Sequence, residues 1–345
     1  MEQESLTADE IALYDRQIRL WGMGTQLRLR SAKVLVINLS AVGTEVVKNL
    51  VLGGLNSLEI LDSSKVKEED FSAQFFLPND DSIVGDLKLL HALPQIQELN
   101  NRVTITSNTR PLNENEGSYF KKFDLVIATE LSSKSEILWL NGITRESNIP
   151  LYVSGLHGMF GYIINDLIRH ESEAEREIGN QPRVVGTSIS GNKTIIGVQY
   201  NKLTNKELVK VEDVYSQLDN VLSSKKVSSQ LNKRQMRRLS ASLPLIFTLF
   251  DWQRPTDIEA DLDNSKLKAA AINMCQHLNI PSTVITDEYV ELVCKQAFTE
   301  FSPTAAILGG CLAQDVIQFL SKKESPINNC LILDGIRSEM PIYSL

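Results

Sequence analysis

The sequence predicts an α/β protein built on a doubly wound, mostly parallel sheet with an inserted crossover segment. Short β-branched apolar runs alternate with helical patterns over the first 170 residues, which is the texture of repeated βαβ units. The same texture returns near the carboxyl end, after a stretch of different composition. The chain has 345 residues, enough for one large α/β unit or for two domains.

A helix is predicted close to the amino terminus. Thr7 and Glu10 have the spacing of a capping box, in which both side chains satisfy free amides at a helix start. Apolar residues then recur at helical spacing as far as Trp21, and Gly22 ends the helix.

The next segment has the pattern of a βαβ unit. Val34–Ile37 is a short β-branched run typical of a buried parallel strand. A helix is expected over about 43–52, closed by Gly53 and Gly54, and Leu58–Asp62 is the second strand. A connection of this kind between parallel strands is right-handed in nearly all proteins.

The chain divides into three predicted parts. Residues 1–170 form the first, Rossmann-like part, and residues 256–345 return to it with helices at 287–297 and 302–320 and a strand at 331–334. The remaining elements of the first part are helices at 85–100 and 134–147 and strands at 102–107, 124–129, 150–154 and 162–166.

The middle part, residues 171–255, is predicted to be an insertion or crossover segment. Glu171–Glu177 is acidic and is predicted to be helical, whereas residues 181–200 alternate like two edge strands. Residues 223–238 are polar and basic. Within them, Lys233–Arg238 could be a nuclear-import signal, although solvated basic runs are common.

Charge and hydropathy exclude several classes of protein. Lys and Arg number 35 against 43 Asp and Glu, a net charge of -8, which argues against a general nucleic-acid binder. The longest apolar runs are far shorter than the roughly 20 residues that cross a bilayer. The first residues lack a basic start and an apolar core, so no secretory signal is expected. We therefore expect a soluble intracellular protein with no membrane partner.

The four cysteines give no sign of a metal or redox site. Cys275, Cys294, Cys311 and Cys330 are widely spaced and form no CxxC pair. Each lies in an apolar run, where a cysteine usually acts as a small buried hydrophobic residue.

The turn after the first strand lacks most of a phosphate-binding motif. A nucleotide-binding βαβ unit places glycines there, because the backbone must approach phosphate closely. In the segment 38–43 only Gly43 remains, and its position mainly allows the helix to pack on the strand. Asp62, at the end of the second strand, would otherwise be a ribose-binding candidate; without the glycines a solvated structural role is preferred.

Five segments carry a resemblance to a known family: Tyr14–Gly22, Asp70–Phe76, Val84–Lys88, Pro303–Gln314 and Asn328–Gly335. Together they resemble the adenylating half of ubiquitin-like-protein activating enzymes, which have the ThiF/MoeB-like adenylation fold. The first block, Tyr-Asp-Arg-Gln-Ile-Arg-Leu-Trp-Gly, is the most specific. Within the family, the likeness is strongest to the smaller, non-catalytic subunits of SUMO-activating heterodimers, and it fails chiefly in residues 171–255.

The family's nucleotide-binding residues are mostly absent here. Ser64 stands where active members have the ribose-binding Asp, and Ala73 stands where they have an Arg that contacts the triphosphate. The magnesium-binding Asp falls at Leu131, with Glu130 one position away, whereas Lys88 matches a phosphate-contacting Lys. The resemblance therefore implies that this chain itself holds neither ATP nor Mg²⁺.

Arg16, in the first block, is the candidate catalytic residue. In the family, the Arg of this block reaches from one half into the partner's ATP site, where a guanidinium can stabilise the charge that builds on phosphate. The alternative is that Arg16 pairs with Asp15 or with a nearby Glu on its own helix. Gly309 and Gly310, within a predicted helix, indicate close backbone approach, either at a subunit interface or in the core.

The resemblance implies a function that this chain performs only in a complex. The holoenzyme would adenylate the carboxyl-terminal glycine of SUMO with ATP and Mg²⁺ bound to the larger subunit. A cysteine of that subunit would then carry SUMO as a thioester, and a SUMO-conjugating enzyme would receive it. The expected location is the nucleus, and also the cytoplasm.

Three alternatives remain open at the level of sequence. One is the equivalent subunit of the NEDD8-activating enzyme, which carries a much larger insertion. Another is a NAD-dependent oxidoreductase, which the lost glycines disfavour. The third is a non-enzymatic scaffold with a relict nucleotide-binding fold, for which Arg16 would have no use.

Overall fold

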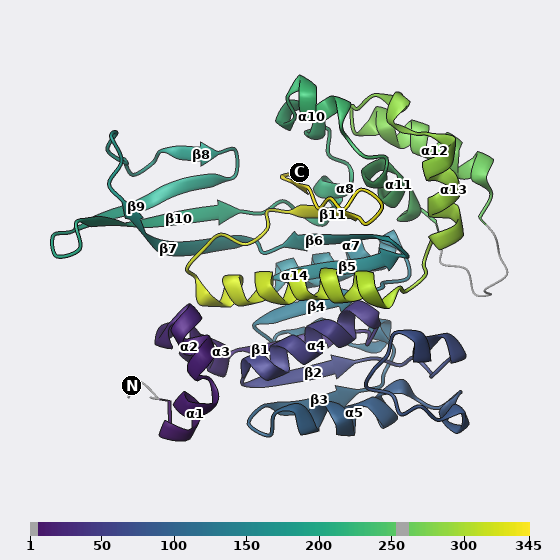
Figure 1. Ribbon diagram of the computed structural model, residues 1–345, viewed down its shortest axis with the longest axis horizontal. Coiled ribbons are helices and arrows are strands. Elements are labelled where there is room, and N and C mark those ends of the chain that lie inside the picture. Colours follow the sequence, from purple (N-terminus) through teal and green to yellow (C-terminus); the bar gives the residue numbers. More distant parts are fainter. Residues whose placement is uncertain (1–5, 253–261) are drawn as a thin grey trace.

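The protein is built around an eight-stranded sheet in the order β12-β11-β6-β5-β4-β1-β2-β3 (Figure 1). The computed structural model describes residues 6–252 and 262–345. Strands β3, β2, β1, β4 and β5 are parallel, and β6, β11 and β12 extend the sheet in antiparallel fashion. The strands span Lys33–Ile37 (β1), Ser57–Leu61 (β2), Thr104–Asn108 (β3), Leu125–Thr129 (β4), Leu151–His157 (β5), Phe160–Asp166 (β6), Cys330–Asp334 (β11) and Ile342–Tyr343 (β12).

Helices cover both faces of this sheet, as the α/β prediction requires, and each face has its own apolar core. On one face lie α4 (Ala41–Gly53), α5 (Lys88–Leu99) and α14 (Ser302–Ser321), with α3 (Met23–Ser31) beside α14. The opposite core includes residues of α6 (Gly117–Phe120), α7 (Lys134–Glu146), α8 (Leu218–Leu222), α11 (Ser242–Leu249), α12 (Asn264–His277) and α13 (Asp287–Gln296).

The predicted amino-terminal helix is interrupted at Tyr14. The capping box is present, since the Thr7 hydroxyl accepts from the Glu10 amide while the Glu10 carboxylate accepts from the Thr7 amide. Helix α1 (Ala8–Leu13) then ends, and α2 (Asp15–Trp21) begins in a new direction (Figure 1). The cause is tertiary: the Tyr14 ring is buried against Gly54, and its hydroxyl accepts a hydrogen bond from Asn100 at 2.9 Å.

The prediction of a helix at Glu171–Glu177 is wrong. This segment lies in β7 (Arg169–Glu177), the edge strand of a second, antiparallel sheet in the order β7-β10-β9-β8. Its other strands are β8 (Ser188–Ser190), β9 (Lys193–Asn201) and β10 (Lys206–Val214). Four glutamates alternate along one face of β7, and Lys210 of β10 pairs with Glu171 at 2.6 Å, so cross-strand pairing overrides the helical propensity of Glu.

The rest of the middle part returns to the main sheet. After α8 come α9 (Val227–Gln230) and α10 (Lys233–Arg237), and then α11, whose residues are all buried against β6, β11 and α12. The proposed division into 1–170, 171–255 and 256–345 stays a prediction. Its second boundary lies outside the described residues.

Helix α14 is long and apolar enough to cross a membrane by composition alone, the one such helix among the residues described. Here it is a core helix: it packs along α4, α3 and β6, and 56% of its apolar window is buried.

Candidate functional site

The turn between β1 and α4 is the place where a fold of this kind would bind phosphate. Asn38 begins the turn with a φ of 64°, and Ser40 is the N-cap of α4. Gly43 is required by packing, since a Cβ there would lie 2.6 Å from the Asn38 carbonyl oxygen and 3.0 Å from Thr129 Oγ1. The predicted structural role of Gly43 is therefore confirmed.

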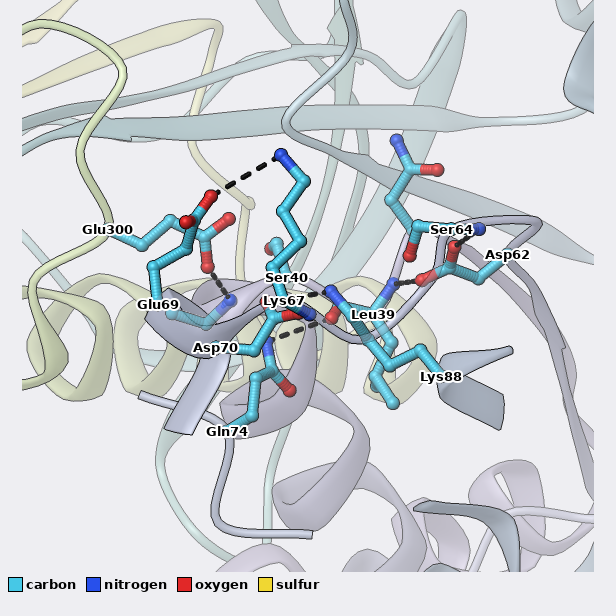
Figure 2. A network of polar contacts seen from close by, with 12 residues as sticks. Leu39, Ser40, Asp62, Ser64, Lys67, Glu69, Asp70, Gln74, Lys88 and Glu300 are labelled. Carbon is cyan, nitrogen blue, oxygen red and sulfur yellow. Dashed lines mark hydrogen bonds and ion pairs between the residues drawn. The ribbon is translucent and has the colours of Figure 1, made fainter. Parts of the chain in front are cut away.

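Backbone amides that would face a phosphate are hydrogen-bonded to side chains of the protein itself (Figure 2). The Leu39 amide donates to Asp62 Oδ2 at 2.7 Å, and the Gly43 amide donates to Ser40 Oγ at 3.0 Å. The Ala41 amide donates to Glu300 Oε2 at 2.5 Å. Two carboxylates thus occupy the amino end of α4.

Asp62 is buried, which corrects the prediction of a solvated strand-end residue. Its exposed fraction is 3%, and its second oxygen accepts from the Ser64 amide at 2.7 Å. Since each of its oxygens accepts from a backbone amide, Asp62 closes the turn and is not presented to a ribose. Ser64 itself lies on the surface.

Gln74 fixes the turn from the side of the following loop. Its Nε2 donates to the Leu39 carbonyl oxygen at 2.9 Å, and its Oε1 accepts from the Thr44 hydroxyl at 2.6 Å. Ala73, beside it, is 8% exposed and packs in the apolar core. The position that the family resemblance assigned to a triphosphate-contacting Arg is therefore part of the packed interior.

Lys88 is paired within the chain. Its Nζ lies 3.0 Å from Asp70 Oδ1, and both side chains are almost buried, with exposed fractions of 9% and 12%. Asp70 belongs to a short 3-10 helix, η1 (Glu68–Ser72), that lies over the turn. By contrast, the neighbouring pair of Lys67 and Glu69, 3.3 Å apart, is largely exposed.

The two residues at the predicted magnesium position, Leu131 and Glu130, make contacts within the chain. Leu131 belongs to the apolar core that also contains residues of α7 and α11, with an exposed fraction of 9%. Glu130 has a positive φ of 48°, and its Oε1 accepts from the Leu156 amide at 2.6 Å. In the described residues, 6–252 and 262–345, no group of three or more acidic, His or Cys side chains is placed to hold a metal ion.

Arg16 is exposed on α2, and its guanidinium makes no hydrogen bond or ion pair with the residues that the structure describes. The alternative pairing with Asp15 is not formed, because Asp15 binds Arg19 instead, at 3.0 Å. Gln17 ties α2 to the carboxyl end of α4 through a 3.1 Å hydrogen bond to the Leu52 carbonyl oxygen.

Arg16 therefore lies far from the turn of its own chain. Helix α4 has 13 residues and rises about 18 Å from Ala41 to Gly53, at 1.5 Å per residue. The phosphate-type turn is at one end of this helix, and α2 is fixed at the other (Figure 1). The side chain is therefore too far away to contact a phosphate held at the turn of its own chain.

The glycine pair in α14 serves two different purposes. A Cβ on Gly309 would lie 2.6 Å from Glu45 Cβ and 3.2 Å from the Val42 carbonyl oxygen, so Gly309 allows α14 to approach α4. A Cβ on Gly310 would meet nothing within 4 Å. Core packing thus explains Gly309, whereas Gly310 lies on an open side of the helix.

None of the four cysteines forms a disulfide, and burial disfavours the reactive thiolate form at three of them. Cys275 and Cys330 are buried, and Cys294 and Cys311 are half-buried. Burial raises the pKa of Cys275 to about 11 and also raises the pKa of Cys311 and Cys330, so the thiolate form is disfavoured.

Glu300 is the site residue that sequence reasoning missed. It lies in the connection between α13 and α14, 259 positions from the amide that it binds. The sequence contains no local signal for this contact, because the contact depends on how two distant helices are placed.

These features define a class of protein: an α/β chain with a nucleotide-binding architecture whose phosphate turn is filled by its own side chains. The model of the ThiF family matches residues 14–345, and the chain belongs to this family. It is 42% identical to the DNA damage tolerance protein RHC31 of Saccharomyces cerevisiae, over 99% of both chains.

Two further relatives match over nearly their full length. The DNA damage tolerance protein rad31 of Schizosaccharomyces pombe is 29% identical over the whole of both chains. SUMO-activating enzyme subunit 1 of Homo sapiens is 29% identical over 96% of this chain and 94% of its own. The predicted fold class and the predicted family are confirmed.

Proposed function

We propose that this chain is the smaller, non-catalytic subunit of a SUMO-activating heterodimer. The support is threefold: membership of the ThiF family, full-length similarity to proteins named SUMO-activating enzyme subunit 1, and a phosphate turn occupied by carboxylates. The observation that carries the proposal is the position of Arg16, an exposed cation held at the end of α4 away from its own turn.

In the proposed reaction, ATP and Mg²⁺ bind to the larger subunit. The carboxylate of the terminal glycine of SUMO attacks the α-phosphorus of ATP, forming an acyl adenylate and releasing pyrophosphate. A cysteine thiolate of the larger subunit then displaces AMP and forms the thioester, which passes to a SUMO-conjugating enzyme. In this proposal, the chain binds no nucleotide at its own β1–α4 turn.

Arg16 would act on the first of these steps. Attack on phosphorus places additional negative charge on the phosphate oxygens, and a guanidinium stabilises that charge with two or more charge-assisted hydrogen bonds. Arginines donated in trans to phosphoryl transfer accelerate it by about a thousandfold or more. A surface arginine whose partner is a phosphate of the neighbouring subunit has no need of a carboxylate partner in its own chain, which agrees with its surroundings here.

The catalytic silence of the isolated chain can be measured directly. Isothermal titration calorimetry of the full chain with ATP and Mg²⁺ should give no binding heat, because the turn amides and Lys88 are already bonded. Micromolar binding of ATP to the isolated chain would contradict this part of the proposal.

The complete function is tested by reconstitution. The chain and the larger subunit are co-expressed and purified, and ATP–pyrophosphate exchange is measured with SUMO and with NEDD8. We expect a one-to-one complex that exchanges pyrophosphate only when SUMO is supplied. Exchange with NEDD8 alone would identify the chain as the equivalent subunit of the other enzyme. Exchange by the larger subunit without this chain would reduce the chain to a scaffold.

We also propose that the protein is nuclear, with a cytoplasmic pool. Exposed cations are concentrated in residues 225–238, and none forms an ion pair with another described residue: Lys225, Lys226, Lys233, Arg234, Arg237 and Arg238. Such a surface fits the acidic groove of an import receptor. A fluorescent fusion with the four cations of Lys233–Arg238 changed to Gln should lose nuclear enrichment; unchanged enrichment would remove this segment from consideration.

A further inference from the structure

Helix α2, which carries Arg16, is too short to be stable by itself. It has seven residues, and none of them is buried. Isolated helices of fewer than about 12 residues are marginal in water, and most helices in proteins are stabilised by their packing. Trp21, at the end of α2, packs half-buried against the core. The place of the Arg16 side chain therefore depends on the contacts that α2 makes with the rest of the chain.

Two side-chain hydrogen bonds join α2 to two other helices. Gln17 Nε2, next to Arg16 in the sequence, donates to the Leu52 carbonyl oxygen of α4 at 3.1 Å. Lys323 Nζ donates to the Trp21 carbonyl oxygen at the end of α2. Since Lys323 follows α14 by two residues, the second bond spans 302 positions of the chain. Helix α2 is thus held both by α4 and by the end of α14.

The ammonium of Lys323 has a prepared place beside α2. Gly22 ends the helix with a φ of 82°, and a Cβ there would lie only 3.1 Å from Lys323 Nζ. The glycine therefore provides both the left-handed turn and the room for the ammonium. A cation is also favoured at the carboxyl end of a helix. Helix α3 is tied to the same end of α14, because Arg28 Nη1 donates to the Ser321 carbonyl oxygen (Figure 1).

We propose that Gln17 and Lys323 are positioning residues for Arg16. They hold α2 on α4 and on the end of α14, so that the guanidinium is kept in one place to meet a phosphate of the larger subunit. This inference rests on the proposed function of Arg16. The physical gain is preorganisation, because a side chain that is already held in place loses less freedom when it binds. Both residues act through Arg16 and do not touch the phosphate.

The first test measures whether these bonds hold α2 in the isolated full chain. Gln17→Met and Lys323→Met keep an unbranched side chain but remove the donor. Lys322→Met is the matched control, because Lys322 is the neighbouring exposed lysine and makes no hydrogen bond to α2 within the part of the chain that the structure describes. Hydrogen–deuterium exchange is followed by mass spectrometry in the peptide that covers residues 15–22.

We expect this peptide to exchange at least about threefold faster in Gln17→Met and in Lys323→Met than in wild type, because local opening becomes easier. Lys322→Met should exchange at the wild-type rate, and so should the peptides of β1 and β4 in every variant. Wild-type exchange of residues 15–22 in both donor variants would show that these bonds do not hold α2, and the proposal would fail.

The second test measures the effect on Arg16 in the heterodimer with the larger subunit, by ATP–pyrophosphate exchange with SUMO. Gln17→Met and Lys323→Met should each lower kcat by about three- to tenfold, since misplacing a group that acts in the transition state slows the reaction. Lys323→Arg, which keeps a cationic donor, should restore most of the rate. Lys322→Met should exchange at the wild-type rate.

A double-mutant cycle separates positioning from a general loss of structure. In the Arg16→Ala background, Lys323→Met should cause no further loss of exchange, because the group through which it acts is already absent. The same fold reduction in both backgrounds would mean that Lys323 does not act through Arg16, and would overturn the positioning role.

The outcomes also distinguish this inference from the proposed function. A wild-type heterodimer that exchanges no pyrophosphate with SUMO would overturn the proposed function and the positioning role together. Exchange that falls in Arg16→Ala, but stays at the wild-type rate in Gln17→Met and Lys323→Met, would support the proposed function and overturn the positioning role alone.

Discussion

The two ends of α4 are both closed by side chains, but with opposite chemistry. At the amino end, amides are met by the carboxylates of Asp62 and Glu300. At the carboxyl end, three carbonyl oxygens accept hydrogen bonds from neutral carboxamides, at distances of 2.9 to 3.1 Å: Asn100 to Val51, Gln17 to Leu52 and Gln26 to Gly53. All three donors at the carboxyl end are therefore uncharged.

Under the proposed function, this difference would let a half that binds no nucleotide retain a chemical role. At the amino end, where a nucleotide would bind, the hydrogen-bonding groups of the turn are used internally. At the carboxyl end, Gln17 and Gln26 hold α2 and α3 in place while Arg16 stays exposed. Because these caps are neutral, they add no carboxylate that could compete for the guanidinium.

The first prediction concerns the nearly buried ion pair between Lys88 and Asp70, on the side of the β1–α4 turn. Lys88→Met should lower the free energy of unfolding by about 3 kcal/mol, because it leaves the nearly buried Asp70 carboxylate without its cation. The measurement is urea unfolding of the full chain. Lys67→Met, which breaks the exposed pair with Glu69, should cost less than about 0.5 kcal/mol. Equal effects of the two changes would show that the Lys88 pair is not buried in solution.

The second prediction contrasts the amide-bound carboxylates at the amino end of α4 with a buried carboxylate of α14, the helix that packs along α4. Asp315 of α14 accepts from the hydroxyl of Tyr152, in β5, at 2.7 Å and from the Ile327 amide at 2.8 Å. Burial nevertheless raises the pKa of Asp315 to about 6. Its proton is held more tightly in the folded state, so its contribution to stability is complete below about pH 4 and is lost as the pH rises through 6.

Asp315→Asn should therefore gain stability relative to wild type as the pH is raised from about 4 to about 7, by about 2 to 3 kcal/mol. Urea unfolding of both proteins across this range measures the difference. A difference that stays constant with pH would mean that Asp315 is hydrated and ionises normally.

The third prediction uses the glycine pair where α14 meets α4. Gly309→Ala should destabilise the chain by about 2 kcal/mol, because the new methyl group overlaps Glu45 and the Val42 carbonyl. Gly310→Ala should stabilise it by up to about 1 kcal/mol through helix propensity alone. Thermal unfolding of the isolated chain separates the two. If Gly310→Ala instead weakens the complex with the larger subunit, this side of α14 is an intersubunit contact.

The fourth prediction tests Arg16, on the helix that is held at the carboxyl end of α4. Arg16→Ala should leave folding and heterodimer formation unchanged, yet slow ATP–pyrophosphate exchange by at least tenfold, about 1.4 kcal/mol of transition-state stabilisation. Arg16→Lys should restore activity only in part, because an ammonium lacks the planar donor pair. Transfer of a preformed thioester to the conjugating enzyme should proceed at the normal rate, since no phosphate takes part.

Arg19→Ala is the matched control, because Arg19 lies on the same helix and is bound to Asp15. Loss of exchange with Arg19→Ala, and not with Arg16→Ala, would move the role by one helical turn. If neither change affects exchange, the trans-acting arginine would have to be abandoned.

The sequence predicted the parts of the fold that local pattern determines. The strand Val34–Ile37 and the helix after it agree with β1 and α4 within two residues, because β-branched runs and helix-ending glycines act locally. The helix α12 was not predicted, and Glu171–Glu177 was assigned to the wrong class. Glutamate favours helices on its own, and only the pairing with β10 makes this segment a strand.

At the site, the family resemblance indicated which nucleotide-binding residues this chain lacks. It could not indicate which side chains occupy the turn instead. Ser64, Ala73 and the missing glycines are visible by position. The burial of Asp62 and the contact of Glu300 with Ala41 depend on packing between α4 and the α13–α14 connection, which no spacing in the sequence records.

The packing of α4 against α14 also has a consequence in time. Helix α4 is buried on nearly every side, and one of those sides is supplied by a helix about 250 residues later in the chain. At a synthesis rate of 5 to 20 residues per second, α4 emerges roughly 10 to 50 seconds before α14 exists. Throughout that interval its apolar surface has no permanent cover. A nascent chain stalled before α14 should therefore be held by chaperones and be rapidly degraded, however complete its first βαβ unit is.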